Sequence, residues 1–494
     1  YHSIFNKYTI RGNMRRYFEE LRCFEVLLIA GEVNASFSGK PSDLLTGAWH
    51  DYLLGSSHDY TLVGGGLNGW YGAATKSNYR GPVQISFQRT LENIMSAKLE
   101  AWSETIRESL AVDEAGEYLT NPHGFTVPAP RFDGVGTASK AVLPPFASLK
   151  VPPVVKRLAS AVPEGEEGVL DNGRVRCLID SKSGAVKVAQ WQGRSLWDDS
   201  QMGVSLSDGV IAVVDGELHD AKETTEGQSV THRGRLVGSD GKTLGWVETS
   251  YLLKAGTDDL LVDVSLCPAL LPPRGDYDWQ KEWKNAFRYR LPRVSRSPMV
   301  WVCQGNALLR GAPGERNAGA AEQSMPDARA HVISPEVLGD ESDDGHSVWY
   351  YNTGFPLYLV YEDRIEQFIR MPGEDHLGLR FGLGFGRSDS SPVQRSRMLL
   401  HAPFRTSQSM PALPFRWENQ RIGLLRTESH HGSGTRRLWF WNYSDRDELF
   451  ALEIAPDYRS SGIIAAGGGV RRDGGESRWI VKAYSLFYLE LIQI

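Results

Sequence analysis

Short alternating segments dominate the sequence after about residue 115 and constrain the fold more than any other feature. Each is rich in β-branched or aromatic residues, and Gly, Pro, Asp or Asn residues bound it. Many short strands separated by turn residues are typical of antiparallel β-sandwiches and not of βαβ units. The lack of a fixed-period repeat argues against a propeller or a solenoid. The clearest predicted strands are residues 174–180, 245–253, 260–266, 347–351, 357–361, 438–441 and 479–481.

The first 110 residues or so have a different pattern, in which apolar residues recur at steps of three and four. This is the period of an amphipathic helix. It predicts helices near residues 13–31, 44–54 and 83–110, with a glycine-rich loop at 64–72 between the second and the third. Three such helices predict an antiparallel bundle.

The fold class is therefore predicted as α+β and multidomain, with a three-helix bundle followed by mainly antiparallel β-sandwich domains. We place the bundle at residues 1–115 and a small β segment with a Pro-rich connector at 116–165. A large β-sandwich is predicted over 166–410, and a C-terminal β domain over 411–494. Residues 311–345 are polar and rich in Gly, Asp and Ala, which predicts a long surface excursion.

Charge and hydropathy limit the partners of the chain. Its 54 basic and 60 acidic residues give a net charge of −6. Phosphate binding needs a basic face, so nucleic acid is not the expected partner, whereas a neutral ligand such as a sugar fits this balance. No stretch reaches the ~18 continuous apolar residues of a membrane-spanning helix.

The four cysteines and the two glycosylation sequons give little information about the fold or the function. No CxxC pair is present, and so sparse a set predicts buried thiols instead of a disulfide framework or a zinc cluster. The sequons at Asn34 and Asn442 are no more than chance predicts in 494 residues. The cysteines are Cys23, Cys177, Cys267 and Cys303.

Two His-Asp dipeptides, His50-Asp51 and His58-Asp59, are the candidate chemical motifs. A neutral imidazole can bind a metal, and a neighbouring carboxylate can bind a ligand or orient the site. Such a dipeptide alone is more often structural. The sequence contains no HExxH, no P-loop, no GxSxG and no dinucleotide fingerprint.

Five segments, taken in order, resemble glycoside hydrolase family 38, the α-mannosidases. The first looks like the family's first bundle helix, and the second contains its Ala-Trp…Leu-Leu…His-Asp motif. The third resembles its Asn-Pro strand, the fourth a following Pro-rich strand, and the fifth the entry to the family's large β-supersandwich. These segments are residues 7–30, 48–59, 118–125, 143–151 and 170–185.

The resemblance implies specific roles for the second His-Asp pair. His58 would be a zinc ligand, Asp59 would contact sugar hydroxyls, and His50 would be a surface residue. Residues 60–79 depart from the family, which usually has a short Gly-Thr or Gly-Ser loop after this pair.

The resemblance also implies what the rest of the enzyme supplies. The family is zinc-dependent and retains configuration, and its nucleophile and acid/base carboxylates lie in a domain before the bundle. No catalytic residue is therefore assigned in this chain. The expected function is that of the C-terminal portion or subunit of such a hydrolase, acting on α-mannosides or related glycans. An N-terminal catalytic domain or partner chain would share the Zn²⁺.

Two other interpretations stay open at this point. The chain could be a non-catalytic carbohydrate-binding or structural β-sandwich module. It could also belong to another class of carbohydrate-active enzyme with a similar supersandwich.

Overall fold

The chain divides into two compact units. One consists of Tyr1–Gly12, Ser57–Asn93 and Arg157–Ser388, and the other of Asn13–Ser56, Ile94–Lys156 and Asp389–Ile494. A computed structural model describes residues 17–27, 40–56, 97–106, 108, 112–128, 142–150, 160–161, 167–198, 202–206, 211–268, 287–297, 300–304, 307–311, 330–333, 336–352, 357–370, 378–386, 391–409, 412–429, 435–465, 469–473 and 478–493, except 19, 99, 225, 239 and 402.

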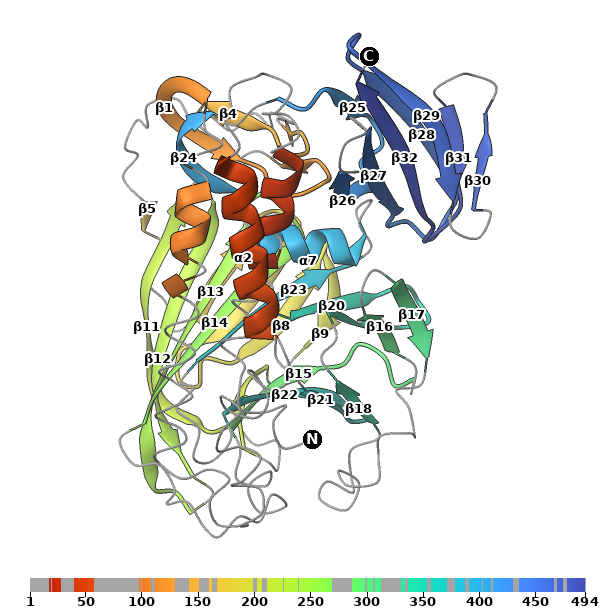
Figure 1. Cartoon of the computed structure of the whole chain (residues 1–494). Helices are drawn as coiled ribbons and strands as arrows, with labels where there is room; N and C mark the ends of the chain where they lie inside the picture. Colours follow the sequence, from red (N-terminus) through yellow and green to blue (C-terminus); the bar gives the residue numbers. More distant parts are fainter. Residues whose placement is uncertain are drawn as a thin grey trace, which may run out of the picture. The chain divides into compact units, whose positions relative to one another are not determined.

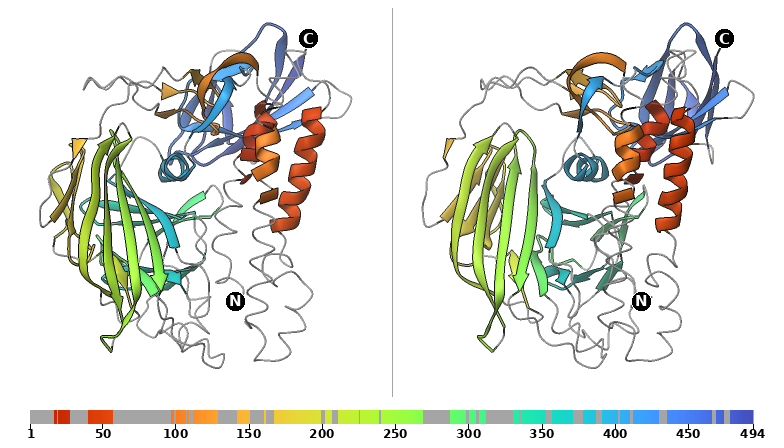
Figure 2. Two further views of the ribbon diagram at one scale, coloured as in Figure 1. Left: turned by 90° about the vertical axis from the view of Figure 1, so that its left-hand side faces the viewer. Right: turned by 60° about the vertical axis from the view of Figure 1, so that its left-hand side comes forward.

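A ten-stranded antiparallel sheet is the largest element of the first unit (Figure 1). Figure 2 shows β11–β14 side by side as one curved layer, which agrees with their long registers. In spatial order the strands are β17 (Ala307–Gly311), β16 (Val300–Gln304), β19 (Val337–Glu341), β20 (Ser347–Asn352), β23 (Gly378–Phe385), β14 (Asp259–Pro268), β13 (Thr243–Lys254), β12 (Gly227–Val237), β11 (Val213–Thr224) and β5 (Ser160–Ala161).

The described residues of this unit form two smaller antiparallel sheets as well. One contains β10 (Gly203–Ser205), β15 (Phe287–Pro292), β22 (Arg364–Arg370), β21 (Leu357–Val360) and β18 (Ala330–Ile333). The other contains β6 (Glu167–Asp171), β7 (Val175–Asp180), β8 (Val186–Trp191) and β9 (Arg194–Trp197). Apolar residues of all three sheets form one hydrophobic core. Within it, the Tyr251 hydroxyl donates to the Gly184 carbonyl (2.7 Å) and lies 3.0 Å from the Tyr289 hydroxyl. The predicted antiparallel β-sandwich class is thus confirmed.

The polar region at 311–345 differs from its prediction. Strand β19 lies within it, and all five of its residues are buried between β16 and β20. Asp340 can be buried there because Arg293 donates to its carboxylate (2.7 Å), as do the amides of Val294 (2.7 Å) and Ser295 (3.0 Å). The prediction of a surface excursion is therefore wrong at 337–341: polar composition hid a strand whose charge is neutralised in the fold.

The second unit contains a β-sandwich of two four-stranded antiparallel sheets. Phe440 and Phe450 (4.9 Å between ring centroids) join the two layers. One sheet consists of β25 (Phe415–Trp417), β28 (Glu448–Ile454), β31 (Arg478–Val481) and β30 (Val470–Arg472), and the other of β26 (Ile422–Ser429), β27 (Thr435–Asn442), β32 (Leu486–Gln493) and β29 (Tyr458–Ala465). Two small sheets accompany it: β24 (Phe404–Ser409), β1 (Val112–Thr120) and β4 (Ser148–Lys150), and β2 (Val127–Pro128) with β3 (Val142–Leu143).

The described helical residues form four short segments. Two are α2 (Lys40–Ser56) and α7 (Pro392–Leu400), and the others lie within 17–27 and 97–108. A three-helix bundle is therefore not supported. Its expected core is not separate either, because Phe24, Leu45 and Ile106 join Phe440 and Phe487 in one hydrophobic cluster. The apolar faces that we assigned to helix–helix packing are shared with a β-sandwich.

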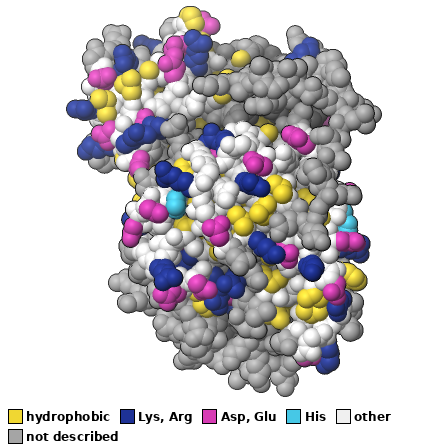
Figure 3. All heavy atoms as spheres, turned by 180° about the vertical axis from the view of Figure 1, so that it is seen from behind, with side chains coloured by type: hydrophobic (Ala, Val, Ile, Leu, Met, Phe, Trp, Pro, Cys, Tyr) yellow, Lys and Arg dark blue, Asp and Glu magenta, His cyan; other side chains and the backbone are white. Residues whose placement is uncertain are grey.

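The predicted boundaries near 115, 165 and 410 remain a prediction. No helix in the described part of the chain is long and apolar enough to cross a membrane. On the face in Figure 3, basic and acidic side chains intermingle over the described surface, and neither sign dominates.

Candidate functional site

Helix α2 leads to the predicted site, because it ends at Ser56, two residues before His58. Asp51 on this helix is 5% exposed, and its carboxylate accepts hydrogen bonds from Lys98 Nζ (2.8 Å) and Trp102 Nε1 (2.8 Å). Burial alone would raise the pKa of Asp51, but these two hydrogen bonds outweigh it and hold the pKa below its usual value. Asp51 therefore anchors α2 to the helical residues near 100.

His50, the neighbour of Asp51, is exposed to solvent. Its side chain is 77% exposed, which agrees with its prediction as a surface residue. The Nδ1 atom of His50 lies 3.7 Å from Asp51 Oδ1. The first His-Asp dipeptide is thus a structural pair in which the carboxylate binds neighbouring helical side chains and the imidazole faces solvent.

His58 and Asp59 lie outside the described residues, so their predicted roles stay predictions. Within the described ranges, no group of three or more His, Cys, Asp or Glu side chains could hold a metal ion. A catalytic zinc site needs about three protein ligands.

Sequence reasoning missed Glu25, a half-buried carboxylate in the helical segment 17–27. Desolvation raises the pKa of Glu25 to about 7, although the positive charges of Arg22 and Arg426 lower it. The available signal was an acidic residue inside the apolar run Cys23–Leu27. A carboxyl group that titrates near neutrality is a candidate for a functional role.

Arg22, one turn earlier, fixes this helical segment to the edge of a sheet. Its side chain is 8% exposed and donates to the backbone carbonyls of Leu425 and Leu424 (3.4 Å to the latter). The register of β26 shifts between Leu424 and Arg426, which makes Leu425 the extra residue of a β-bulge. Arg22 thus pairs carbonyl groups at a sheet edge that would otherwise be open.

The segment 118–125, which resembles the Asn-Pro strand of family 38, makes hydrogen bonds to several other segments of the chain. Asn121 is fully buried, and its Nδ2 donates to the carbonyls of Phe125 (2.9 Å) and Pro144 (2.9 Å). His123 Nε2 lies 2.7 Å from the carbonyl oxygen of His401 just after α7. These contacts join β1, the β3–β4 connection and α7, so the role of the segment in this chain is architectural.

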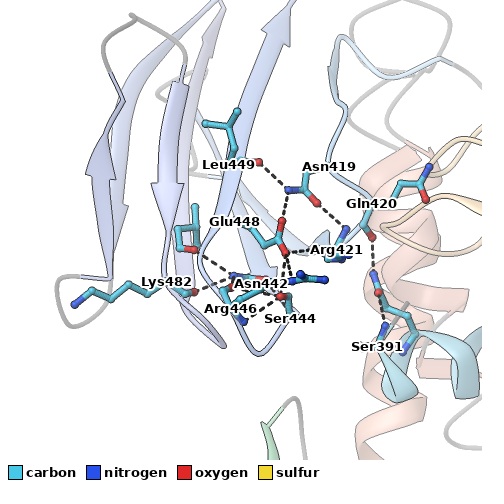
Figure 4. A network of polar contacts seen from close by, with 12 residues as sticks. Ser391, Asn419, Gln420, Arg421, Asn442, Ser444, Arg446, Glu448, Leu449 and Lys482 are labelled. Atoms are coloured by element: carbon cyan, nitrogen blue, oxygen red, sulfur yellow. Dashed lines mark hydrogen bonds and ion pairs between the residues drawn. The ribbon is translucent and has the colours of Figure 1, made fainter. Parts of the chain in front are cut away.

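The sequon at Asn442 is also structural. Asn442 is fully buried, and its Nδ2 donates to the carbonyls of Arg446 (2.9 Å) and Lys482 (3.0 Å) (Figure 4). In the same network Glu448 accepts from Arg421 Nη1 (2.8 Å) and Ser444 Oγ (3.0 Å). The Nδ2 that a glycan would modify is thus occupied in the folded chain.

The cysteines fit their prediction where they are described. Cys23, Cys177 and Cys303 are buried. Burial raises the pKa of Cys177 to about 12, so its reactive thiolate is scarce at neutral pH.

Comparisons with known proteins identify solved structures with a similar fold. No protein-family model matches the sequence, and no curated protein matches it. Among solved structures, an alpha-mannosidase from Enterococcus faecalis V583 is similar with a TM-score of 0.60 and 10% identity, over 98% of this chain and 68% of the other. A protein in glycosyl hydrolase family 38 from Enterococcus faecalis is similar with a TM-score of 0.61 and 9% identity, over 99% of this chain and 70% of the other. The chain therefore shares the fold of these glycoside hydrolase structures over nearly its whole length.

Proposed function

We propose that this chain is part of a zinc-dependent, retaining glycoside hydrolase that acts on α-mannosides or related glycans. The observation that carries the proposal is the fold similarity to two family 38 structures over 98% and 99% of the chain. The five ordered segments that resemble family 38 support it independently, because they are features of the amino-acid sequence and not of the fold. At 9–10% identity the similarity concerns the fold, so the activity is our inference.

In this proposal His58 is a zinc ligand and Asp59 binds sugar hydroxyls. Zinc, when bound, would hold two sugar hydroxyls and favour a distorted ring. Retaining hydrolysis needs a nucleophilic carboxylate and a second carboxyl that acts first as acid and then as base. We place both in a domain or partner chain outside these 494 residues, which would also share the zinc. The contribution of α2, anchored through Asp51, would be to support the segment that bears His58 and Asp59.

The first experiment measures the native mass and zinc content of the purified protein together with anything that co-purifies. A second polypeptide and about one zinc per complex are expected. The complex should hydrolyse an aryl α-mannoside, and the 494-residue chain alone should not. A single, metal-free chain that binds glycans without any partner would favour the non-catalytic module instead.

Substitution of His58 tests the residue assignment. His58→Ala should weaken zinc binding by more than the roughly 10- to 100-fold that loss of an outer partner causes, because a direct ligand is removed. His50→Ala is the matched control, since this exposed imidazole lies eight residues earlier. Zinc affinity by competition with a chelator and hydrolysis by the complex are separate readouts. Unchanged zinc affinity and activity in His58→Ala would overturn the assignment.

A further inference from the structure

An exposed tryptophan stands on the solvent-facing side of the ten-stranded sheet. Trp246 in β13 is 43% exposed, and both of its neighbours in the strand, Gly245 and Val247, are buried. The other side of β12–β14 carries the core residues Val230, Tyr251 and Val264, among others. Trp246 is therefore held by its strand on the outer side, where it contributes nothing to the hydrophobic core.

Hydrogen-bonding side chains lie next to Trp246 on β12 and β13, whereas its register partner on β14 is Cys267. Arg235 of β12 is directly opposite it, and the next pair along the same face is Arg233 with Glu248. Glu248 is in turn opposite Ser265 of β14. Adjacent strands are about 5 Å apart, and next-but-one residues about 7 Å. Arg235, Arg233 and Glu248 thus lie about 5 to 9 Å from Trp246 along the sheet.

A second row extends the same face. Thr231 Oγ1 and Ser250 Oγ lie 3.0 Å apart, and Ser250 is opposite Asp263. Asp263 pairs in turn with Arg380 of β23, whose guanidinium is 4.0 Å away. The hydroxyl, carboxylate and guanidinium groups together both donate and accept hydrogen bonds, as a polyhydroxylated ligand requires.

The charged residues of this face indicate which class of ligand it can bind. Its basic residues Arg233, Arg235 and Arg380 are offset by four acidic residues, which are Glu248, Asp263, Asp215 paired with Arg235, and Glu217 opposite Arg233. A balanced face does not provide the basic field that nucleic acid needs. A protein interface is depleted of charged residues at its centre, whereas charged residues adjoin Trp246 directly. An aromatic ring among paired charges instead fits the apolar C–H face and the hydroxyl groups of an uncharged sugar.

We propose that the outer face of β12–β14 around Trp246 is a binding surface for neutral glycans. The indole stacks on one sugar ring, whose hydroxyl groups Glu248 and Arg233 bind. The Thr231–Ser250 hydroxyl pair, four residues further along the strands, binds the hydroxyl groups of a neighbouring sugar in the same glycan. Arg233, whose Cζ lies 5.7 Å from the centroid of the indole, positions the ring by a cation–π contact. This surface does not require the proposed zinc site, since none of its groups belongs to the segment around His58.

Affinity electrophoresis of the full chain in native gels that contain mannan, dextran or heparin tests this proposal. We expect mannan or dextran to retard the wild-type chain and heparin not to. Trp246→Ala should weaken retardation at least tenfold, while Trp246→Phe should retain part of it because an aromatic face remains. Ile464→Ala is the matched control, since it truncates a 49% exposed hydrophobic side chain of the other unit.

Other outcomes overturn the proposal. They are equal retardation of wild type and Trp246→Ala, retardation by heparin alone, or no retardation by either neutral glycan. Loss of retardation in His58→Ala but not in Trp246→Ala would assign glycan binding to the His58 segment. Melting curves of each variant verify that it is folded. Zinc content is measured in parallel, so that failure of this surface and failure of the zinc proposal remain distinct.

Discussion

At the scale of the residue, the fold shifts the pKa values of chemically similar side chains in opposite directions. Asp51 and Glu25 are both carboxylates on helical segments, yet the pKa of Asp51 is lowered and that of Glu25 is raised to about 7. Asp51 receives two short hydrogen bonds, whereas desolvation dominates at Glu25. The apolar run Cys23–Leu27 is a local signal for the desolvation of Glu25, whereas the partners that lower the pKa of Asp51, Lys98 and Trp102, come from a distant segment.

Glu25 makes stability depend on pH. Its pKa of about 7 in the fold lies above its ordinary value of 4.5, so the folded state keeps its proton while the unfolded chain loses it. Stability contributed by Glu25 is therefore complete at low pH and is lost as pH rises from about 4.5 to 7. Glu25→Gln should stabilise the protein by about 1–3 kcal/mol at pH 8 and have little effect at pH 4.

Urea unfolding at pH 4 and pH 8 measures this effect. The exposed Glu104→Gln substitution on the neighbouring helical segment is the control. An equal change in stability at both pH values for Glu25→Gln would contradict the prediction.

At the scale of the element, strand β19 contains a glycine, Gly339, whose lack of a side chain leaves room for a tryptophan ring. Gly339 pairs with Trp349 on one side and Trp301 on the other. A Cβ atom on Gly339 would lie 2.3 Å from Cζ3 and 2.4 Å from Cε3 of the Trp349 ring. The indole thus lies over the glycine, and the sequence, which presents the region as polar and loop-like, gives no sign of this packing.

Gly339→Ala should therefore destabilise the protein by about 1–3 kcal/mol, because the buried indole has to move. Gly311→Ala is the control in the same sheet, since no atom lies within 4 Å of its added Cβ. Thermal melting of the two variants compares them. Equal melting temperatures would show that Trp349 shifts without cost.

At the scale of the whole molecule, the chain has two compact units, each with its own core. Phe381 is fully buried in one core and Phe440 in the other. Truncating either to alanine should cost about 3–5 kcal/mol. In calorimetry, we expect two unfolding transitions. Phe381→Ala should lower the melting temperature of one transition, and Phe440→Ala that of the other. A single transition that both variants lower equally would mean that the units unfold together.

The sequence by itself determined the β-sandwich class and most clear strands, such as β7, β13 and β14, because side-chain alternation is a local consequence of a two-faced sheet. It also predicted α2 and the buried thiols. Its motifs resemble family 38, and an alpha-mannosidase and a family 38 protein share its fold, while the roles of His58 and Asp59 remain predictions. Only the tertiary structure decided that the helical segments share a core with a β-sandwich, that β19 is buried, and that Glu25 titrates near neutrality. Each of these depends on which distant residues become neighbours, and hydrophobic periodicity carries no information about that.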